Sequence, residues 1–140
     1  MILQFKDEYR WLSNFWPSKV TLDGVTYPSV ENAYQAAKTV IKDERKFFIN
    51  CTSGQAKQRG KEITQREDWP FIKIAVMRDL LIQKFRDPIL KQKLIDTGDQ
   101  RIREGNNWND KFWGVCLKTG VGNNHLGNLI TEIRDINNGK

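Results

Sequence analysis

The amino-acid sequence predicts an α+β fold in which helices dominate a small antiparallel sheet. Two patterns carry this prediction: residues alternate on either side of Asp23-Gly24 near the start, and apolar residues recur at helical spacing in the middle of the chain. With 140 residues, of which 39% are hydrophobic and 11% aromatic, the chain can bury a core of its own. We therefore expect a single domain over residues 1–140.

The β structure is expected mainly in the first part of the chain. Residues 1–5 are predicted to form an opening strand. Residues 19–27 are predicted to form a hairpin, because Asp23-Gly24 tolerates the positive φ angles of a tight turn. Two further short strands are expected near residues 101–103 and 114–117, on either side of an asparagine-rich loop.

Helices are expected over much of the remainder. Ser29 follows Pro28 and can cap a helix by accepting a backbone N–H from its first turn. Ser53 can open a second helix in the same way, and Pro88 suits the first turn of another. The strongest pattern is the buried helix face between Phe71 and Phe85. The expected helices cover residues 30–41, 53–63, 71–85, 88–95 and 126–136.

Composition limits the kind of protein. The net charge of +6 favours anionic partners such as phosphates or nucleic acid, although basic and acidic residues alternate as on an ordinary solvated surface. No stretch approaches 18 apolar residues, and no leader-like segment starts the chain, so we expect a cytoplasmic protein without a membrane span. Cys51 and Cys116 lack metal-site spacing, and we expect reduced, structural thiols.

A polar stripe is predicted on the first helix. Glu31, Gln35 and Lys38 are spaced i, i+4 and i+7, which places them on one helix face. One interpretation is a solvated surface with a weak Glu–Lys network. The other is a functional stripe pressed into the protein, which the small neighbours Ala33 and Ala36 favour.

A second polar cluster is expected in the loop from Glu104 to Gly114. This loop combines two carboxylates, three amides and two indoles. Amides and carboxylates suit sugar hydroxyls, and indole faces stack on planar bases. The alternative is a turn-rich surface loop in which Trp108 and Trp113 anchor the core. No histidine lies near the cluster, so a metal site is not expected there.

A glycine-rich segment, Gly120–Gly127, precedes the last expected helix. Backbone N–H groups and the positive end of the helix dipole suit a phosphate, although a plain helix-entry turn explains the pattern equally well. The segment lacks the Gly-Lys-Ser/Thr ending of a P-loop. His125, the single histidine, is expected to be structural.

Taken in order, these motifs resemble the NADAR, or YbiA-like, superfamily over nearly the whole chain. The matching motifs are Leu12-Ser13-Asn14-Phe15; Asp23-Gly24-x-x-Tyr27-Pro28-Ser29-x-Glu31-x-x-Tyr34-Gln35-Ala36-x-Lys38; Met77 with Lys84-Phe85; Glu104-Gly105-Asn106-x-Trp108-x-Asp110-x-x-Trp113-Gly114; and Gly122-x-Asn124-x-Leu126-Gly127. Two positions depart from the pattern of the closer subgroup: Asn109 stands where His is common, and Asn123 where Lys is common. The second departure weakens the expected phosphate clamp.

The resemblance implies an N-glycosidase that needs no metal or cofactor and hydrolyses the bond between ribose C1 and a base-like nitrogen. The implied substrates are phosphorylated ribosylamino-pyrimidine intermediates of riboflavin synthesis, or related N-ribosides. An alternative is an ADP-ribosyl-guanine hydrolase acting on modified nucleic acid, which the positive charge favours. A third is a non-catalytic module that binds ADP-ribose or another nucleotide.

Breaking a C1–N bond builds positive charge on the sugar, so the site needs a carboxylate, a proton route and a nucleophile. Glu31 is the expected proton shuttle. Lys38 is the expected amine nucleophile, which opens the ribose through an imine, as the resemblance also suggests. In a competing mechanism Lys38 stays charged while Glu31 or Asp110 orients a water molecule.

The remaining site residues are expected to bind substrate. Four are expected to hold sugar hydroxyls, one to stack on the base, and two to receive phosphate in the glycine-rich segment; in that order they are Asn14, Gln35, Glu104 and Asn106, then Trp113, then Gly122 and Asn124. For Asn14, capping of the Ser-Asn-Phe turn is an equally simple explanation.

Overall fold

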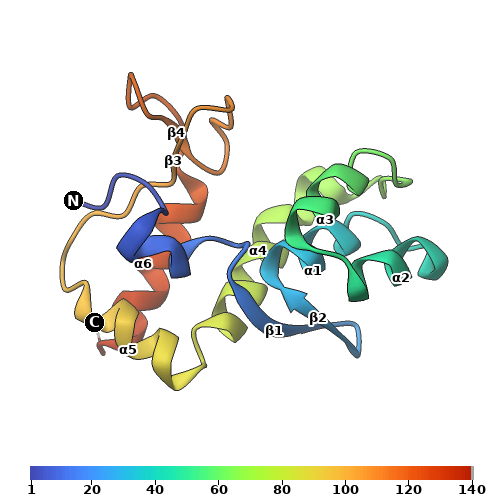
Figure 1. Cartoon of the computed structure of the whole chain (residues 1–140), viewed down its shortest axis with the longest axis horizontal. Helices are drawn as coiled ribbons and strands as arrows, with labels where there is room; N and C mark the ends of the chain where they lie inside the picture. Colours follow the sequence, from blue (N-terminus) through green and yellow to red (C-terminus); the bar gives the residue numbers. More distant parts are fainter. Residues whose placement is uncertain (140) are drawn as a thin grey trace. The chain divides into compact units, whose positions relative to one another are not determined.

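The computed structural model describes residues 1–139 and confirms the α+β class. The helices are the 3₁₀ helix η1 (Asp7–Leu12) and α1 (Val30–Ala37), α2 (Lys42–Asn50), α3 (Ser53–Arg59), α4 (Trp69–Lys84), α5 (Pro88–Asp96) and α6 (His125–Asn137). The strands are β1 (Pro17–Leu22), β2 (Val25–Ser29), β3 (Gly105–Asn106) and β4 (Val115–Cys116) (Figure 1). None of the helices within residues 1–139 has the length and apolar character needed to cross a membrane.

The β1–β2 hairpin is antiparallel, as predicted, and pairs Val20 with Tyr27 and Leu22 with Val25. Its turn holds Asp23 at φ 49° and Gly24 at φ 80°, the positive angles that a two-residue hairpin turn requires. Val20 and Tyr27 are both buried, so the paired residues on one face contribute to the core.

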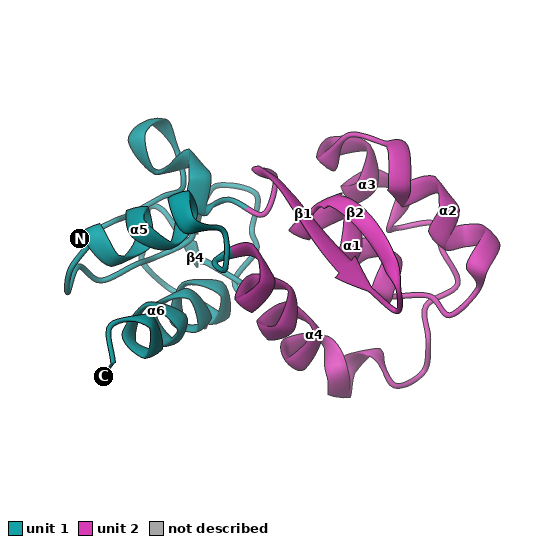
Figure 2. Ribbon diagram, turned by 90° about the horizontal axis from the view of Figure 1, so that it is seen from below, with its two compact units in different colours: residues 1–13, 85–140 teal, residues 14–84 magenta. Residues whose placement is uncertain are grey.

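The chain forms two compact units: residues 14–84, and residues 1–13 with 85–140 (Figure 2). In the first unit α1 is the central element, because it packs against both hairpin strands and against α2, α3 and α4. All eight residues of α1 are buried. A polar side chain on α1 therefore lies inside this unit rather than on a solvated face.

The second unit is built around the pair α5 and α6. Arg134 of α6, buried to 3% exposure, donates to the Thr97 hydroxyl at 3.0 Å and to the Gln100 carbonyl at 2.7 Å. These bonds tie α6 to the segment that follows α5. The short strands β3 and β4 pair in parallel and position the loop between them.

Several predicted elements differ from the structure. The opening strand is wrong: Ile2 forms only an isolated parallel bridge to Ile102, because the two segments share too few paired residues for a strand. The strand expected at residues 101–103 is reduced to that bridge, and the strand proper is β3.

Two helices are shorter than predicted, and two, η1 and α2, were not predicted. The first helix ends near Lys38 instead of Ile41, because the Thr39 hydroxyl and carbonyl bond to Ile41 N–H and to the Arg45 side chain. The second ends at Arg59. Helix α2 was not predicted, since it buries only Phe48 and so has no apolar period to detect.

Candidate active site

Helix α1 is fixed in its rotation by two residues of its first turn. Ser29 caps the helix by accepting the Asn32 N–H at 3.1 Å, as predicted. The Asn32 side chain is fully buried and donates at 2.9 Å to the carbonyls of Phe48 and Cys51, where α2 ends. Sequence reasoning missed Asn32, which lies next to Glu31 but outside the i, i+4, i+7 spacing of the stripe. These bonds determine which way Glu31 points.

Glu31 and Gln35 form a buried pair on α1. Their side chains are 8% and 5% exposed, and the Gln35 amide Nε2 donates to Glu31 Oε1 at 3.0 Å. Burial excludes the interpretation of the stripe as a solvated salt-bridge face. A buried carboxylate is costly unless it is hydrogen-bonded, so the Gln35 amide is part of what lets Glu31 remain inside.

Asn14 lies beside this pair. Its backbone carbonyl accepts the Glu31 N–H at 3.1 Å, and its side-chain amide donates to the Met77 thioether at 3.6 Å. The side-chain oxygens of Asn14 and Gln35 are buried without a hydrogen-bond partner among the described residues. A buried acceptor without a partner is uncommon and calls for an explanation, of which substrate contact is one.

Lys38 is half-buried at the end of α1. Burial lowers the pKa of its amine below the usual value; the Glu31 carboxylate opposes this effect, and the Lys73 ammonium adds to it. The Lys38 Nζ also lies 5.5 Å from the centre of the Tyr34 ring. A lowered pKa increases the share of the neutral amine, which is the change that an amine nucleophile requires.

In the other unit the loop from Glu104 to Gly114 is held by its own polar side chains. The Asn106 amide, 1% exposed, donates to Glu104 Oε2 at 2.7 Å and to the Asp110 carbonyl at 2.9 Å, and accepts the Asp110 N–H at 3.1 Å. Asp110 Oδ1 in turn accepts the N–H groups of Phe112 and Trp113, at 3.2 and 2.9 Å. This carboxylate closes a turn through one oxygen.

The aromatic residues of this loop differ in exposure. Trp113 is half-buried and lies edge-on to Phe112, with ring centres 4.9 Å apart, and Phe112 also contacts the His125 ring at 4.5 Å. Trp108 is 54% exposed, so the interpretation in which it anchors the core is wrong. His125 belongs to this aromatic cluster, in keeping with a structural role.

The glycine-rich segment has a clear structural function. Gly122 has φ 150°, and a Cβ there would lie 2.8 Å from Val115 Cα, so only glycine fits. Asn124 Oδ1 accepts the Glu104 N–H at 3.0 Å, and its Nδ2 donates to the Ile102 carbonyl at 3.0 Å. The N–H groups of Asn124, His125 and Leu126 donate to carbonyls of residues 112–114. These three N–H groups, at the helix start where phosphate was expected, thus bond within the protein.

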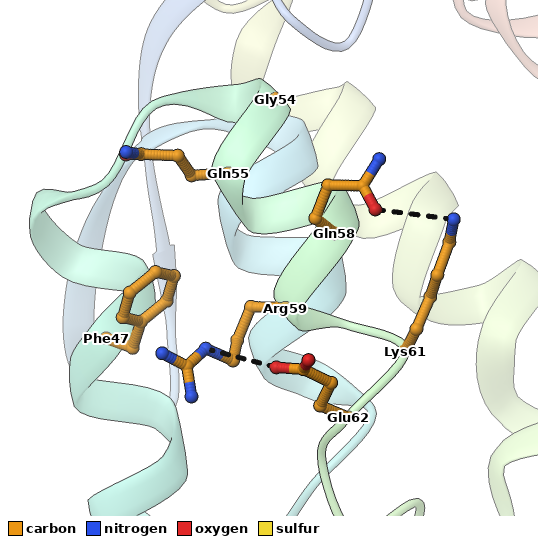
Figure 3. A pocket seen from close by; sticks show the side chains of 7 residues that line it. All are labelled: Phe47, Gly54, Gln55, Gln58, Arg59, Lys61 and Glu62. Atoms are coloured by element: carbon orange, nitrogen blue, oxygen red, sulfur yellow. Dashed lines mark hydrogen bonds and ion pairs between the residues drawn. The ribbon is translucent and has the colours of Figure 1, made fainter.

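Two features lie outside the predicted site. Lys84 is fully buried at the end of α4, and burial lowers the pKa of its amine to about 7. Two signals mark it in the sequence: its position in an apolar helix face and its place in the Lys84-Phe85 motif. An open groove of about 450 Å³ lies along α3 and is lined by Phe47, Gly54, Gln55, Gln58, Arg59, Lys61 and Glu62 (Figure 3). None of the predicted site residues lines this groove.

The structure thus gathers the predicted residues into two groups, one in each unit. Asn14, Glu31, Gln35 and Lys38 lie around α1, and the residues from Glu104 to Asn124 form the loop network. Among residues 1–139, no three His, Cys, Asp or Glu side chains are grouped as metal ligands would be.

These features define an α+β protein with a buried carboxylate and amide on helix α1 and a half-buried lysine at its end. The NADAR domain profile matches residues 3–136, and the chain belongs to that family. The NMR structure of the Escherichia coli protein YbiA has a TM-score of 0.82 to this chain at 29% identity, covering 97% of this chain and 86% of that one.

Relatives in sequence carry related names. The chain is 34% identical over 135 residues to the N-glycosidase YbiA of Escherichia coli (92% of this chain, 82% of that protein). It is 31% identical over 134 residues to an N-glycosidase of Nostoc punctiforme (91% and 85%). It is 32% identical over 133 residues to a riboflavin biosynthesis protein of Vibrio vulnificus, covering 92% of this chain but only 36% of that longer protein.

Proposed function

We propose that this protein is an N-glycosidase that hydrolyses the bond between ribose C1 and a base-like nitrogen, with phosphorylated ribosylamino-pyrimidines as substrates. The observation that carries the proposal is the lowered pKa of the Lys38 amine close to the buried Glu31 carboxylate. Relatives named N-glycosidase and riboflavin biosynthesis protein support the bond type and the substrate class. The reaction proposed uses no metal and no cofactor.

The proposed chemistry begins when a proton passes from Lys38 to Glu31 and the neutral Lys38 amine attacks ribose C1. The C1–N bond breaks and the base nitrogen takes that proton from Glu31. The attacking nitrogen then gives a proton to the ring oxygen by way of Glu31, and the ring opens to leave a protonated imine between Lys38 and C1. Water adds to the imine, with Glu31 as the base, and releases free ribose phosphate and the Lys38 amine. The proton then returns from Glu31 to Lys38, so the whole cycle restores the starting protonation states of both groups.

A competing mechanism keeps Lys38 protonated as a hydrogen-bond donor. A carboxylate then orients water for direct attack on C1, and Glu31 or Asp110 can take that role. The Asp110 Oδ1 atom is occupied by two backbone N–H groups, so this mechanism would use its Oδ2 atom. Glu31, in contrast, accepts a hydrogen bond from the side-chain amide of Gln35.

Substrate contacts are proposed for both groups of residues. In the α1 group Asn14 and Gln35 are proposed to bind sugar hydroxyls, and the partnerless Asn14 oxygen supports this for Asn14. In the loop network Glu104 and Asn106 are proposed for hydroxyls, Trp113 for the base, and Gly122 and Asn124 for phosphate. Trp113 is only half-buried, so part of its side chain remains accessible to a ligand.

A second candidate activity is removal of ADP-ribose from guanine in nucleic acid. The net charge of +6 favours it, because a positive field concentrates polyanions at the surface. Turnover of a phosphorylated ribosylamino-pyrimidine and of an ADP-ribosylated oligonucleotide, measured side by side over a range of salt concentrations, separates the two. If neither substrate is hydrolysed while a nucleotide still raises the melting temperature, the result favours a non-catalytic module that binds nucleotide.

The covalent step is tested by borohydride, which reduces an imine to a stable amine. Substrate with borohydride should add the mass of a reduced ribose phosphate to the peptide that holds Lys38, and Lys38→Ala should abolish both the adduct and turnover. Lys42→Ala, a change of an exposed lysine on α2, is the matched control. Turnover by Lys38→Ala at the wild-type rate would remove Lys38 from the mechanism.

A further inference from the structure

Gly60 follows the last turn of α3, and its backbone gives no reason for a glycine. Its φ and ψ are −58° and −17°, which is ordinary right-handed helical geometry, and its N–H donates to the Ala56 carbonyl at 2.9 Å. Any residue adopts these angles, and alanine adopts them at lower entropic cost. A glycine is therefore needed at this buried position because a side chain would not fit, and not because of its backbone angles.

The space is occupied by the side chain of Gln35. A Cβ placed on Gly60 would overlap Gln35 Oε1 and would lie 2.6 Å from Gln35 Cδ. The Oε1 atom has no hydrogen-bond partner among residues 1–139, so it rests against the Gly60 Cα–H, a contact that is at best a weak hydrogen bond. The Oε1 end of the Gln35 amide is thus held by packing against Gly60 and not by a hydrogen-bond donor.

The other end of the same amide meets Glu31. Gln35 Nε2 donates to Glu31 Oε1 at 3.0 Å, and both side chains are more than nine-tenths buried. If the amide turned over, its oxygen would face the carboxylate oxygen, which is unfavourable while Glu31 is ionised. The orientation of the Gln35 amide is thus coupled to the charge on Glu31, and Gly60 provides the room in which that orientation fits.

We propose that Gly60 is a positioning residue for Glu31, which acts by leaving space for the Gln35 amide that donates to the carboxylate. This inference rests on the proposed function only in naming Glu31 as the proton shuttle. The arrangement itself lies wholly within residues 14–84. It assigns Gln35 a role in setting the protonation of Glu31, whether or not Gln35 also touches the sugar.

A matched pair of substitutions on one helix tests the proposal. Gly60→Ala should displace Gln35, remove the hydrogen bond to Glu31, and move the titration of Glu31 to higher pH by about one unit, since a lost donor favours the protonated carboxyl. Gly54→Ala is the control, because a Cβ there meets nothing closer than the Thr52 hydroxyl, at 4.0 Å, and Gly54 lies at the open groove (Figure 3). It should leave the Glu31 titration unchanged.

The titration is followed by NMR of the ¹³C-labelled Glu31 carboxyl, which needs no turnover. In the same experiment Gln35→Ala should shift Glu31 as Gly60→Ala does, and the double variant Gln35→Ala/Gly60→Ala should match Gln35→Ala alone. The double variant should also melt higher than Gly60→Ala, because removing the Gln35 side chain makes room for the new methyl group. This comparison holds even if Gly60→Ala is poorly folded.

Two results would overturn the proposal. One is a folded Gly60→Ala protein in which the titration of Glu31 is not shifted. The other is a Gly60→Ala substitution that changes stability and the Glu31 titration as much in the Gln35→Ala protein as in the wild type. Enzymatic pH profiles then address the chemistry separately. If Glu31 shifts as expected while the acidic limb of the kcat/KM profile stays in place, the positioning role stands and the assignment of Glu31 as proton shuttle fails.

Discussion

Helix α1 and the loop from Glu104 to Gly114 both carry polar residues that break the expected pattern, but they use their hydrogen bonds differently. On α1, Glu31 and Gln35 bond to each other through their side chains, and an oxygen of Gln35 stays without a partner. In the loop, Asn106, Asp110 and Asn124 bond mainly to backbone groups. The first arrangement positions chemical groups; the second builds a turn.

The difference has a simple structural origin. Backbone groups of α1 are satisfied within the helix, so its polar side chains are left to meet one another or a ligand. The loop has no such internal pairing, and its amides and carboxylates complete the backbone bonding that a helix or sheet would supply. We therefore expect substitutions on α1 to affect rate, and substitutions in the loop to affect stability.

The largest expected effect on this comparison comes from Glu31→Gln. The substitution keeps the shape of the side chain but removes the proton shuttle, so kcat/KM should fall by about 10²- to 10⁴-fold, the usual contribution of a general acid–base group. The melting temperature should stay the same or rise, because a buried charge is removed. Steady-state kinetics and thermal unfolding measure the two. Loss of stability together with unchanged kcat/KM would reverse the roles of the two regions.

Asn106→Ala should give the largest loss of stability in the loop. The change removes three hydrogen bonds and leaves the Glu104 carboxylate and the Asp110 backbone without this partner, which should lower the free energy of unfolding by about 3 kcal/mol. Urea unfolding is the measurement. The control is Asn107→Ala, an exposed neighbour that should change stability by less than about 0.5 kcal/mol. Equal effects at the two positions would contradict the network.

The sequence was most informative where local chemistry decides the structure. The turn at Asp23-Gly24, the cap at Ser29 and helix α4 were all predicted and are confirmed, because each depends on residues close together in the chain. The buried face expected from Phe71 to Phe85 is confirmed only from Met77 onward, since Phe71 is 88% and Ile74 39% exposed. Helix α2 was missed since most of its residues face solvent and a single Phe48 anchors it. Its existence depends on packing against distant elements rather than on its own pattern.

The site was predictable in its residue types but not in its connections. The spacing of Glu31, Gln35 and Lys38 identified the stripe, while its burial depends on the elements packed around α1. The contact between Gln35 and Gly60 joins residues 25 positions apart, and no local rule reveals it. In the loop, the amide and carboxylate residues that suggested sugar binding are also typical of a turn. Which backbone groups they bind is decided by the folded structure.

Asp110 offers a smaller effect that separates charge from structure. Asp110→Asn keeps an oxygen able to accept the N–H groups of Phe112 and Trp113, whereas Asp110→Ala removes it and should cost about 1 kcal/mol, as loss of a capping side chain does. If the carboxylate only closes the turn, Asp110→Asn should retain both stability and kcat/KM. A stable Asp110→Asn protein with kcat/KM lowered a hundredfold or more would instead favour the direct-water mechanism through this residue.

The smallest effect expected is at Lys73, and its direction distinguishes the two mechanisms on α1. The Lys73 ammonium helps burial to lower the pKa of Lys38, so Lys73→Gln should raise that pKa. In both mechanisms the falling limb of the kcat/KM profile then moves to higher pH. If neutral Lys38 is the nucleophile, less of the enzyme carries the neutral amine and the rate near pH 7 falls a few-fold. If Lys38 must stay charged, the rate near pH 7 does not drop. Lys42→Gln changes the net charge equally from an exposed position on α2 and should leave both limbs in place. High salt should reduce the Lys73 effect, because mobile ions screen the repulsion between the two amines.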